Sequence, residues 1–139
     1  MSHHYQRPAI IIVEDAADIR ILVQRLIHDL THDFDLIAVD ASTKALEHLA
    51  HRTVPLLVTD YAMPGMDGLE LTRRVKAASP ATTIVMITAH ESAKLRAQAA
   101  AAGAEHFLAK PFPLSQFEQL ARAVLERWQA QRPRESAGS

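Results

Sequence analysis

Cysteine is absent from the 139 residues of this chain. Its absence excludes a disulfide-stabilised scaffold, thiol catalysis and any metal site built on cysteine ligands. No apolar run approaches the ~20 residues of a membrane-spanning helix, and the N-terminus lacks the apolar core of a signal peptide. The net charge of -1 provides no excess of positive charge for general nucleic-acid binding. We therefore expect a soluble, cytoplasmic domain.

The composition is that of an ordinary globular domain. Hydrophobic residues make up 48% of the chain and charged residues 22%, close to the averages for soluble proteins. A chain of this length is about the size of one domain and buries a core without disulfides. We expect residues 8–129 to form that domain. Residues 1–7 are expected to be disordered or added by cloning, and residues 130–139 to form a flexible tail or linker.

Five short apolar runs indicate β-strands, because they are rich in β-branched residues and too short for buried helices. Segments with helical periodicity follow them, such as the apolar stripe from Ile19 to Leu30. This alternation predicts an α/β fold, an open, doubly wound, five-stranded parallel sheet with helices on both faces. The expected strand order is flavodoxin-like, 2-1-3-4-5. The five runs are Ala9–Val13, Leu36–Val39, Leu56–Thr59, Thr83–Ile87 and His106–Ala109.

Several residues indicate where the helices begin and end. Ser42 is expected to cap the second helix. Ser115 and Glu118 have the spacing of a capping box at the start of the fifth helix. Gly103 lies where the C-cap of the fourth helix belongs.

Chemically active side chains lie at the carboxyl ends of four predicted strands. Glu14 and Asp15 follow the first strand, Asp60 the third, Thr88 the fourth and Lys110 the fifth. Open α/β sheets bind ligands at this edge, and the first and third strands are neighbours in the expected order. Carboxylates that share a small site raise one another's pKa unless cations compensate. Lys110 supplies one positive charge, and an all-oxygen donor set suits magnesium.

Each of these residues also has an ordinary structural interpretation. Asp15 or Asp18 could cap the first helix, and a Lys-Pro pair is common in turns. Five such residues at five appropriate positions favour a shared site instead. His28 and His32 have the i, i+4 spacing of a metal-binding pair, but no third ligand converges on them. A surface role near the end of the first helix is therefore expected for both.

Four motifs surround the residues of this shared site. They are Val13-Glu14-Asp15, the segment from Thr59 to Gly68, Met86-Ile87-Thr88-Ala89 and Lys110-Pro111-Phe112. Together they resemble the receiver domain of bacterial two-component response regulators, similar to chemotaxis regulators. The resemblance extends over nearly the whole chain. Its Asp-x-x-Met-Pro-x-Met-Asp-Gly segment is highly specific, and the other motifs follow in the right order.

The resemblance implies a role for each residue of the acidic cluster. Asp60 would be the phosphoacceptor, taking a phosphoryl group from a phosphohistidine to form an acyl phosphate. Asp15, Asp60 and the backbone carbonyl of Ala62 would ligate Mg²⁺ or Mn²⁺, and Glu14 would hold a coordinated water. Lys110 would pair with a phosphoryl oxygen. Phosphoryl transfer needs this kind of charge neutralisation on the equatorial oxygens.

The resemblance also implies a two-state switch. The Thr88 hydroxyl would turn toward the phosphoryl group, and the ring of Phe107 would move inward behind it. The Lys110–Pro111 bond is expected to be cis. Ala62 and His90 would flank the path of the attacking water and influence the lifetime of the phosphoryl group.

On this interpretation the chain is a signalling switch rather than a metabolic enzyme, with only self-phosphotransfer and autodephosphorylation. Its partners would be a histidine kinase or histidine phosphotransfer protein, and a downstream protein or second copy bound through the fourth helix, fifth strand and fifth helix. Direct contact with nucleic acid or membrane is not expected. The alternatives are an aspartate-nucleophile phosphohydrolase, which would require aspartate where Ala62 stands, and a receiver-like scaffold that is never phosphorylated.

Overall fold

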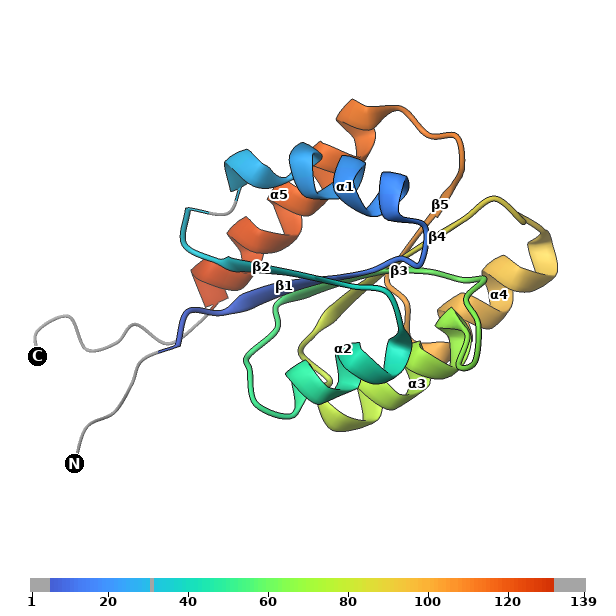
Figure 1. The fold of residues 1–139 in the computed structure, drawn as a ribbon, viewed down its shortest axis with the longest axis horizontal. Helices are drawn as coiled ribbons and strands as arrows, with labels where there is room; N and C mark the ends of the chain where they lie inside the picture. Colours follow the sequence, from blue (N-terminus) through green and yellow to red (C-terminus); the bar gives the residue numbers. More distant parts are fainter. Residues whose placement is uncertain (1–5, 31, 132–139) are drawn as a thin grey trace, which may run out of the picture.

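The computed structural model describes residues 6–30 and 32–131, so the expectations for residues 1–5 and 132–139 lie outside it. All five strands are parallel and have the order β2-β1-β3-β4-β5 (Figure 1). This order confirms the predicted doubly wound topology. The strands are β1 (Ala9–Val13), β2 (Asp35–Val39), β3 (Leu56–Asp60), β4 (Thr83–Thr88) and β5 (His106–Ala109).

Helices cover both faces of the sheet, as the alternating pattern predicts. Figure 1 shows α1 and α5 together on one face and α2, α3 and α4 on the other. The helices are α1 (Ala17–Leu26), α2 (Ser42–Leu49), α3 (Gly68–Ala78), α4 (Ala93–Ala102) and α5 (Leu114–Gln131), with a 3-10 turn η1 (His28–Leu30) after α1.

The sheet divides the hydrophobic core into two layers. Alternate β1 side chains point to opposite faces, because side chains in a strand alternate. Ile10 and Ile12 pack in the layer under α1 and α5 with Phe117. Ile11 and Val13 pack in the other layer, under α2 and α3. All five β1 residues are buried, as expected for a strand with neighbours on both sides.

The helix ends confirm one predicted cap and correct others. Gly103 has a φ of +112°, as a left-handed C-cap requires, which confirms its predicted place at the end of α4. At the start of α4 the Ser92 hydroxyl accepts the Leu95 N–H. Ser42 is not the cap of α2: Ala41 holds that position, and the Ser42 hydroxyl donates to the Met66 carbonyl, 2.9 Å away. Ser42 therefore joins α2 to the loop after β3.

The fifth helix differs from its prediction at both ends. It begins at Leu114, and the Pro113 carbonyl accepts the N–H groups of Gln116 and Phe117, so Ser115 lies inside the first turn rather than at the cap. The helix continues to Gln131, which places two residues of the expected tail within it. The amphipathic stripe extends far enough for Trp128 to pack against Phe34, with the ring centroids 5.9 Å apart.

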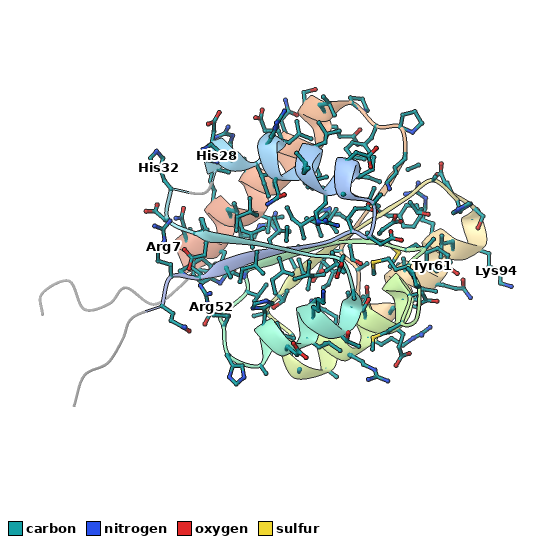
Figure 2. The ribbon with its side chains drawn as sticks, in the orientation of Figure 1. Arg7, His28, His32, Arg52, Tyr61 and Lys94 are labelled. Carbon is teal, nitrogen blue, oxygen red and sulfur yellow. The ribbon has the colours of Figure 1, made fainter. Side chains whose placement is uncertain are left out.

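Two arginines join three segments at the end of the sheet opposite the carboxyl ends of the strands (Figure 2). Arg52 donates to the Asp35 carboxylate at 2.6 Å and to the Arg7 carbonyl at 2.7 Å. Arg7 also pairs with Asp35, at 3.5 Å, and donates to the carbonyls of His32 and Phe34. These contacts connect the segment before β1, the start of β2 and the loop before β3.

Within residues 6–30 and 32–131, no helix has both the length and the apolar character needed to cross a bilayer. His28, in η1, and His32, in the turn after it, are exposed, consistent with the expected surface role. In the described part of the chain, neither histidine belongs to a group of three potential metal ligands.

Candidate functional site

Three carboxylates meet where β1 and β3 end. Glu14 directly follows β1 and Asp60 ends β3, and these strands pair in register, with Val13 opposite Thr59. One carboxylate oxygen from each of Glu14, Asp15 and Asp60 lies within 4.8 Å of the other two. Glu14 is buried, Asp60 is partly buried and Asp15 is exposed. The cluster therefore has a buried base and one side open to solvent.

Lys110 brings a positive charge into this cluster from the loop after β5. Its Nζ donates to Asp60 Oδ2 at 3.2 Å and to Glu14 Oε1 at 3.3 Å. The Lys110–Pro111 peptide bond is cis, and the Lys110 backbone N–H donates to the Thr88 carbonyl at 2.7 Å. The fold thus brings together the side chains that the sequence places at the ends of β1, β3 and β5.

The pKa values of this cluster follow from burial and mutual charge. Burial raises the pKa of Glu14, and the negative charge of Asp60 adds to the increase. The Ala16 N–H and Lys110 act in the opposite direction without cancelling it. Burial alone would lower the pKa of Lys110, but the charges of Asp60 and Glu14 outweigh it, and its pKa is raised. Lys110 is therefore a fixed cation among carboxylates it does not fully neutralise.

Replacing Glu14 by glutamine should stabilise the metal-free protein at neutral pH. The folded-state pKa of Glu14 is raised above 4.5, so ionisation costs the folded state stability as pH rises through that pKa. Below the ordinary value of 4.5, the carboxyl is protonated in both states, and the advantage of Glu14→Gln should disappear. Urea unfolding with a chelator at both pH values measures this difference. A lower unfolding midpoint at neutral pH would show that the lost Lys110 pair dominates.

Beside the cluster, two backbone N–H groups donate hydrogen bonds to side-chain oxygens. Thr88 is fully buried at the end of β4, and its hydroxyl accepts the His90 N–H at 2.9 Å. The Ala62 N–H donates to Asp60 Oδ1 at 3.3 Å. The Ala62 and His90 side chains are exposed. The Thr88 hydroxyl is thus engaged with the β4–α4 loop.

Phe107 lies on β5, which β4 separates from β3 and its Asp60. Its ring is partly buried against the group formed by Leu69, Met86 and Leu95. The Arg96 guanidinium lies over the ring, 4.6 Å from its centroid, which is within cation–π range. Arg96 also pairs with Glu91 in the loop before α4. The Phe107 ring is therefore in contact with α4, and Arg96 links it to that loop.

Two contributors to the site do not stand out from the sequence pattern. Arg20 donates to the Glu14 carbonyl at 2.8 Å. Gly68 begins α3, and its N–H donates to the Tyr61 carbonyl at 2.8 Å. A Cβ at Gly68 would lie 2.4 Å from the Asp60 carbonyl oxygen. The Asp67-Gly68 pair signals a turn, but only the fold shows that this turn touches the backbone of Asp60.

An apolar groove lies beside the cluster, between α1 and the loop after β5. Its volume is about 440 Å³, and it is lined by side chains that include Leu22, Ile87 and Phe112. Lys110 lines the groove and also contacts Asp60. Leu22 and Leu114 also line the groove and are 42% and 48% exposed, so part of its apolar surface is open to solvent.

Comparison with known proteins agrees with this geometry. The family described as "Response regulator receiver domain" matches residues 10–122. The chain is 31% identical over 120 residues to the C4-dicarboxylate transport transcriptional regulatory protein DctD of Rhizobium meliloti (strain 1021). It is 29% identical over 126 residues to the DNA-binding transcriptional regulator NtrC of Escherichia coli (strain K12).

These matches cover 86% and 91% of the chain but 26% of each relative, so the chain spans about a quarter of their length. Among solved structures, the signal receiver domain of an HD domain-containing protein from Pseudomonas fluorescens Pf-5 matches with a TM-score of 0.81 and 30% identity. That match covers 91% of this chain and 100% of the other. A beryllofluoride-activated DrrB receiver domain matches with a TM-score of 0.79 and 21% identity, over 88% and 100% of the two chains, which is a likeness of fold.

Proposed function

The chain belongs to the family of response regulator receiver domains, which are phosphoacceptor switches, and on that premise we propose that Asp60 accepts its phosphoryl group. The observation that carries the proposal is the contact between Lys110 Nζ and Asp60 Oδ2, at 3.2 Å, inside a cluster of three carboxylates. A carboxylate attacks phosphorus only in its ionised form, and Lys110 is a cation in direct contact with that carboxylate. Lys110 would also balance negative charge on the transferred phosphoryl group.

The reaction that we propose is a transfer between two side chains. An oxygen of the ionised Asp60 carboxylate attacks the phosphorus of a phosphohistidine. The P–N bond breaks, the imidazole leaves with its electron pair and takes up a proton, and an acyl phosphate remains on Asp60. Water later attacks that phosphorus, the P–O bond to the carboxylate breaks, and inorganic phosphate leaves. Ala62 and His90 flank Asp60 and Thr88, and we propose that they set the rate of this hydrolysis.

The carboxylate cluster fits a hard divalent cation, because its donors are oxygen atoms within 4.8 Å of one another. We propose Mg²⁺ or Mn²⁺, held by Asp15, Asp60 and the Ala62 carbonyl, with Glu14 holding a coordinated water. When bound, the ion neutralises charge on the transferred phosphoryl group. Glu14, in contact with Lys110, forms the buried base of the site, and the exposed Asp15 leaves its other side open to a donor.

The apolar groove supports a protein donor, such as a histidine kinase or histidine phosphotransfer protein. A phosphohistidine side chain reaches Asp60 only if its own protein docks beside the site. Lys110 is common to the groove and the site, so a helix placed on Leu22 and Leu114 would bring its histidine near Asp60. The phosphohistidine of such a donor is formed with ATP, and we therefore propose a cytoplasmic location for the reaction.

We propose that Thr88 and Phe107 transmit the modified state. In this structure the Thr88 hydroxyl accepts the His90 N–H. A hydroxyl that turned toward a phosphoryl oxygen would leave this N–H and release the β4–α4 loop, which is the differential contact that a two-state switch requires. Glu91 in that loop pairs with Arg96, and Arg96 lies over Phe107, so a change in the loop alters the surroundings of the ring.

The output surface that we propose consists of α4, β5 and α5. Of the ten α4 residues, only Leu95 and Ala99 are buried, so few contacts hold this helix in place. A downstream protein or a second copy of the chain would bind there in the phosphorylated state. The apolar contacts that α4 does make include Met86 of β4, which connects the surface to the sheet.

A titration followed by backbone-amide NMR tests this function in two steps. Mg²⁺ should shift the amides of Asp15, Asp60 and Ala62, and beryllofluoride, a phosphoryl mimic, should then shift those of Thr88 and Phe107. Trp128 is a poor reporter, since it packs against Phe34 away from the site. Absence of any response would favour an unphosphorylated scaffold. Repeated turnover of a phosphomonoester would favour a phosphohydrolase.

A further inference from the structure

Arg20 lies in the first turn of α1 and reaches back to the loop that carries two of the carboxylates. Its backbone N–H donates to the Ala16 carbonyl at 2.9 Å. One guanidinium nitrogen, Nη1, donates to the Glu14 carbonyl at 2.8 Å and lies 3.5 Å from the Asp15 carbonyl. The side chain is only partly exposed. Arg20 thus hydrogen-bonds to the backbone of the residues that carry the carboxylates and not to the carboxylates themselves.

The loop between β1 and α1 has few other restraints. Ala16 is the N-cap of α1, and no side chain caps the helix there. The Glu14 N–H donates to the Val39 carbonyl at 3.0 Å, which is the last sheet contact of this segment. Beyond it, Glu14 Oε2 accepts the Ala16 N–H, at 3.2 Å. That bond uses a carboxylate oxygen of the cluster itself, whereas the bond from Arg20 is independent of the cluster.

The positive charge of Arg20 and its hydrogen bond to the loop have opposite effects on cation binding. A positive charge near the cluster repels a divalent cation, so removing it would strengthen metal binding if charge alone mattered. A positioned loop lowers the cost of ordering Glu14 and Asp15 around a cation, so removing the contact would weaken binding. The two effects have opposite signs, and one measurement therefore separates them.

We infer that Arg20 is a positioning residue of the phosphoacceptor site, holding the β1–α1 backbone so that Glu14 and Asp15 face a divalent cation. This inference rests on the proposed function. The hydrogen bond of 2.8 Å to the Glu14 carbonyl, directly after the end of β1, outweighs a repulsion that solvent screens. Arg20 touches neither the phosphoryl group nor the cation, and it acts through the loop.

The test compares Arg20→Met with Arg25→Met in the full chain. Both substitutions remove one positive charge from α1 and keep a long apolar side chain, and Arg25 lies exposed in the last turn of the helix. Mg²⁺ affinity is measured by NMR titration, and the metal-free amide shifts of Glu14 to Ala16 report the loop. Arg20→Met should weaken Mg²⁺ binding about tenfold and move those amide shifts. Arg25→Met should stay within about twofold of the wild type.

The possible outcomes separate the inference from the proposed function. Unchanged or tighter Mg²⁺ binding in Arg20→Met, beside a wild type that binds normally, overturns the positioning role alone. A wild type that binds no Mg²⁺ overturns the metal site and this inference with it. Arg20→Lys keeps the charge without the planar guanidinium, and we expect weaker binding than in the wild type. If Arg20→Met does not fold, wild-type affinity in Arg20→Lys overturns the inference.

Discussion

Replacing Asp60 by asparagine should reduce phosphoryl labelling below about 1% of the wild-type level, because only background reaction remains without the nucleophile. The amide has nearly the same shape as the carboxylate, so the side chain still fits beside Lys110. It cannot serve as the nucleophile, since the role needs an ionised oxygen. Labelling is measured with acetyl phosphate and with a phosphorylated histidine kinase, each in the presence of Mg²⁺.

The control for Asp60→Asn is Asp29→Asn, the same change at an exposed carboxylate in η1, remote from the cluster. It should label like the wild type, and circular dichroism should show that both variants are folded. Full labelling of Asp60→Asn would remove Asp60 from the role of phosphoacceptor. The acyl phosphate would then have to be sought on Asp15 or Glu14.

Replacing Gly68 by alanine should have the second large effect, although position 68 carries no reactive group. The added Cβ would lie 2.4 Å from the Asp60 carbonyl oxygen and 2.9 Å from the Tyr61 Cα. Both neighbours are backbone atoms, so neither can rotate away as a side chain would. Either the start of α3 or the end of β3 must move, at a cost of about 1–3 kcal/mol in the free energy of unfolding. A displacement near 1 Å at Asp60 should slow phosphoryl acceptance by roughly a hundredfold.

Gly65→Ala is the matched control for Gly68→Ala, because the two glycines lie in the same loop region. Gly65 has a φ of +77°, and a Cβ there would meet no atom within 4 Å. We therefore expect Gly65→Ala to lower the free energy of unfolding by about 1 kcal/mol, because alanine is strained in the left-handed backbone conformation. This variant should still accept the phosphoryl group at nearly the wild-type rate. Urea unfolding and initial labelling rates measure both quantities. Equal labelling rates in the two variants would contradict the role given to the Gly68 contact.

The sequence predicted the fold because the fold depends on patterns that are local and repeated. Each strand is a short apolar run, and the burial of all five β1 residues follows from a central position in a parallel sheet. The same pattern predicted the meeting of Glu14, Asp60 and Lys110, since parallel strands place their carboxyl ends at one edge. The helices on both faces also follow, because right-handed crossovers place helices on opposite faces of the sheet when the strand order reverses direction after β2.

The details that the sequence did not predict depend on contacts between distant segments. Ser42 has the chemistry of a helix cap, yet its hydroxyl bonds to Met66, 24 residues away. Ser115 and Glu118 match a capping box, but the Pro113 carbonyl accepts the N–H groups of the first turn. Arg20 reads as one polar residue in an amphipathic helix, and only the path of the β1–α1 loop reveals its carbonyl contact. In each case a competing tertiary partner decided the outcome.

Direct chemical identification of the modified residue tests the central claim. The wild-type protein is phosphorylated by a histidine kinase with Mg²⁺, reduced at once with borohydride, and mapped by peptide mass spectrometry. Reduction of an acyl phosphate on aspartate yields homoserine, so we predict homoserine at position 60 and none when Mg²⁺ is replaced by a chelator. Homoserine at another position, or phosphate retained on a histidine or serine, would contradict the assignment of Asp60 as the phosphoacceptor.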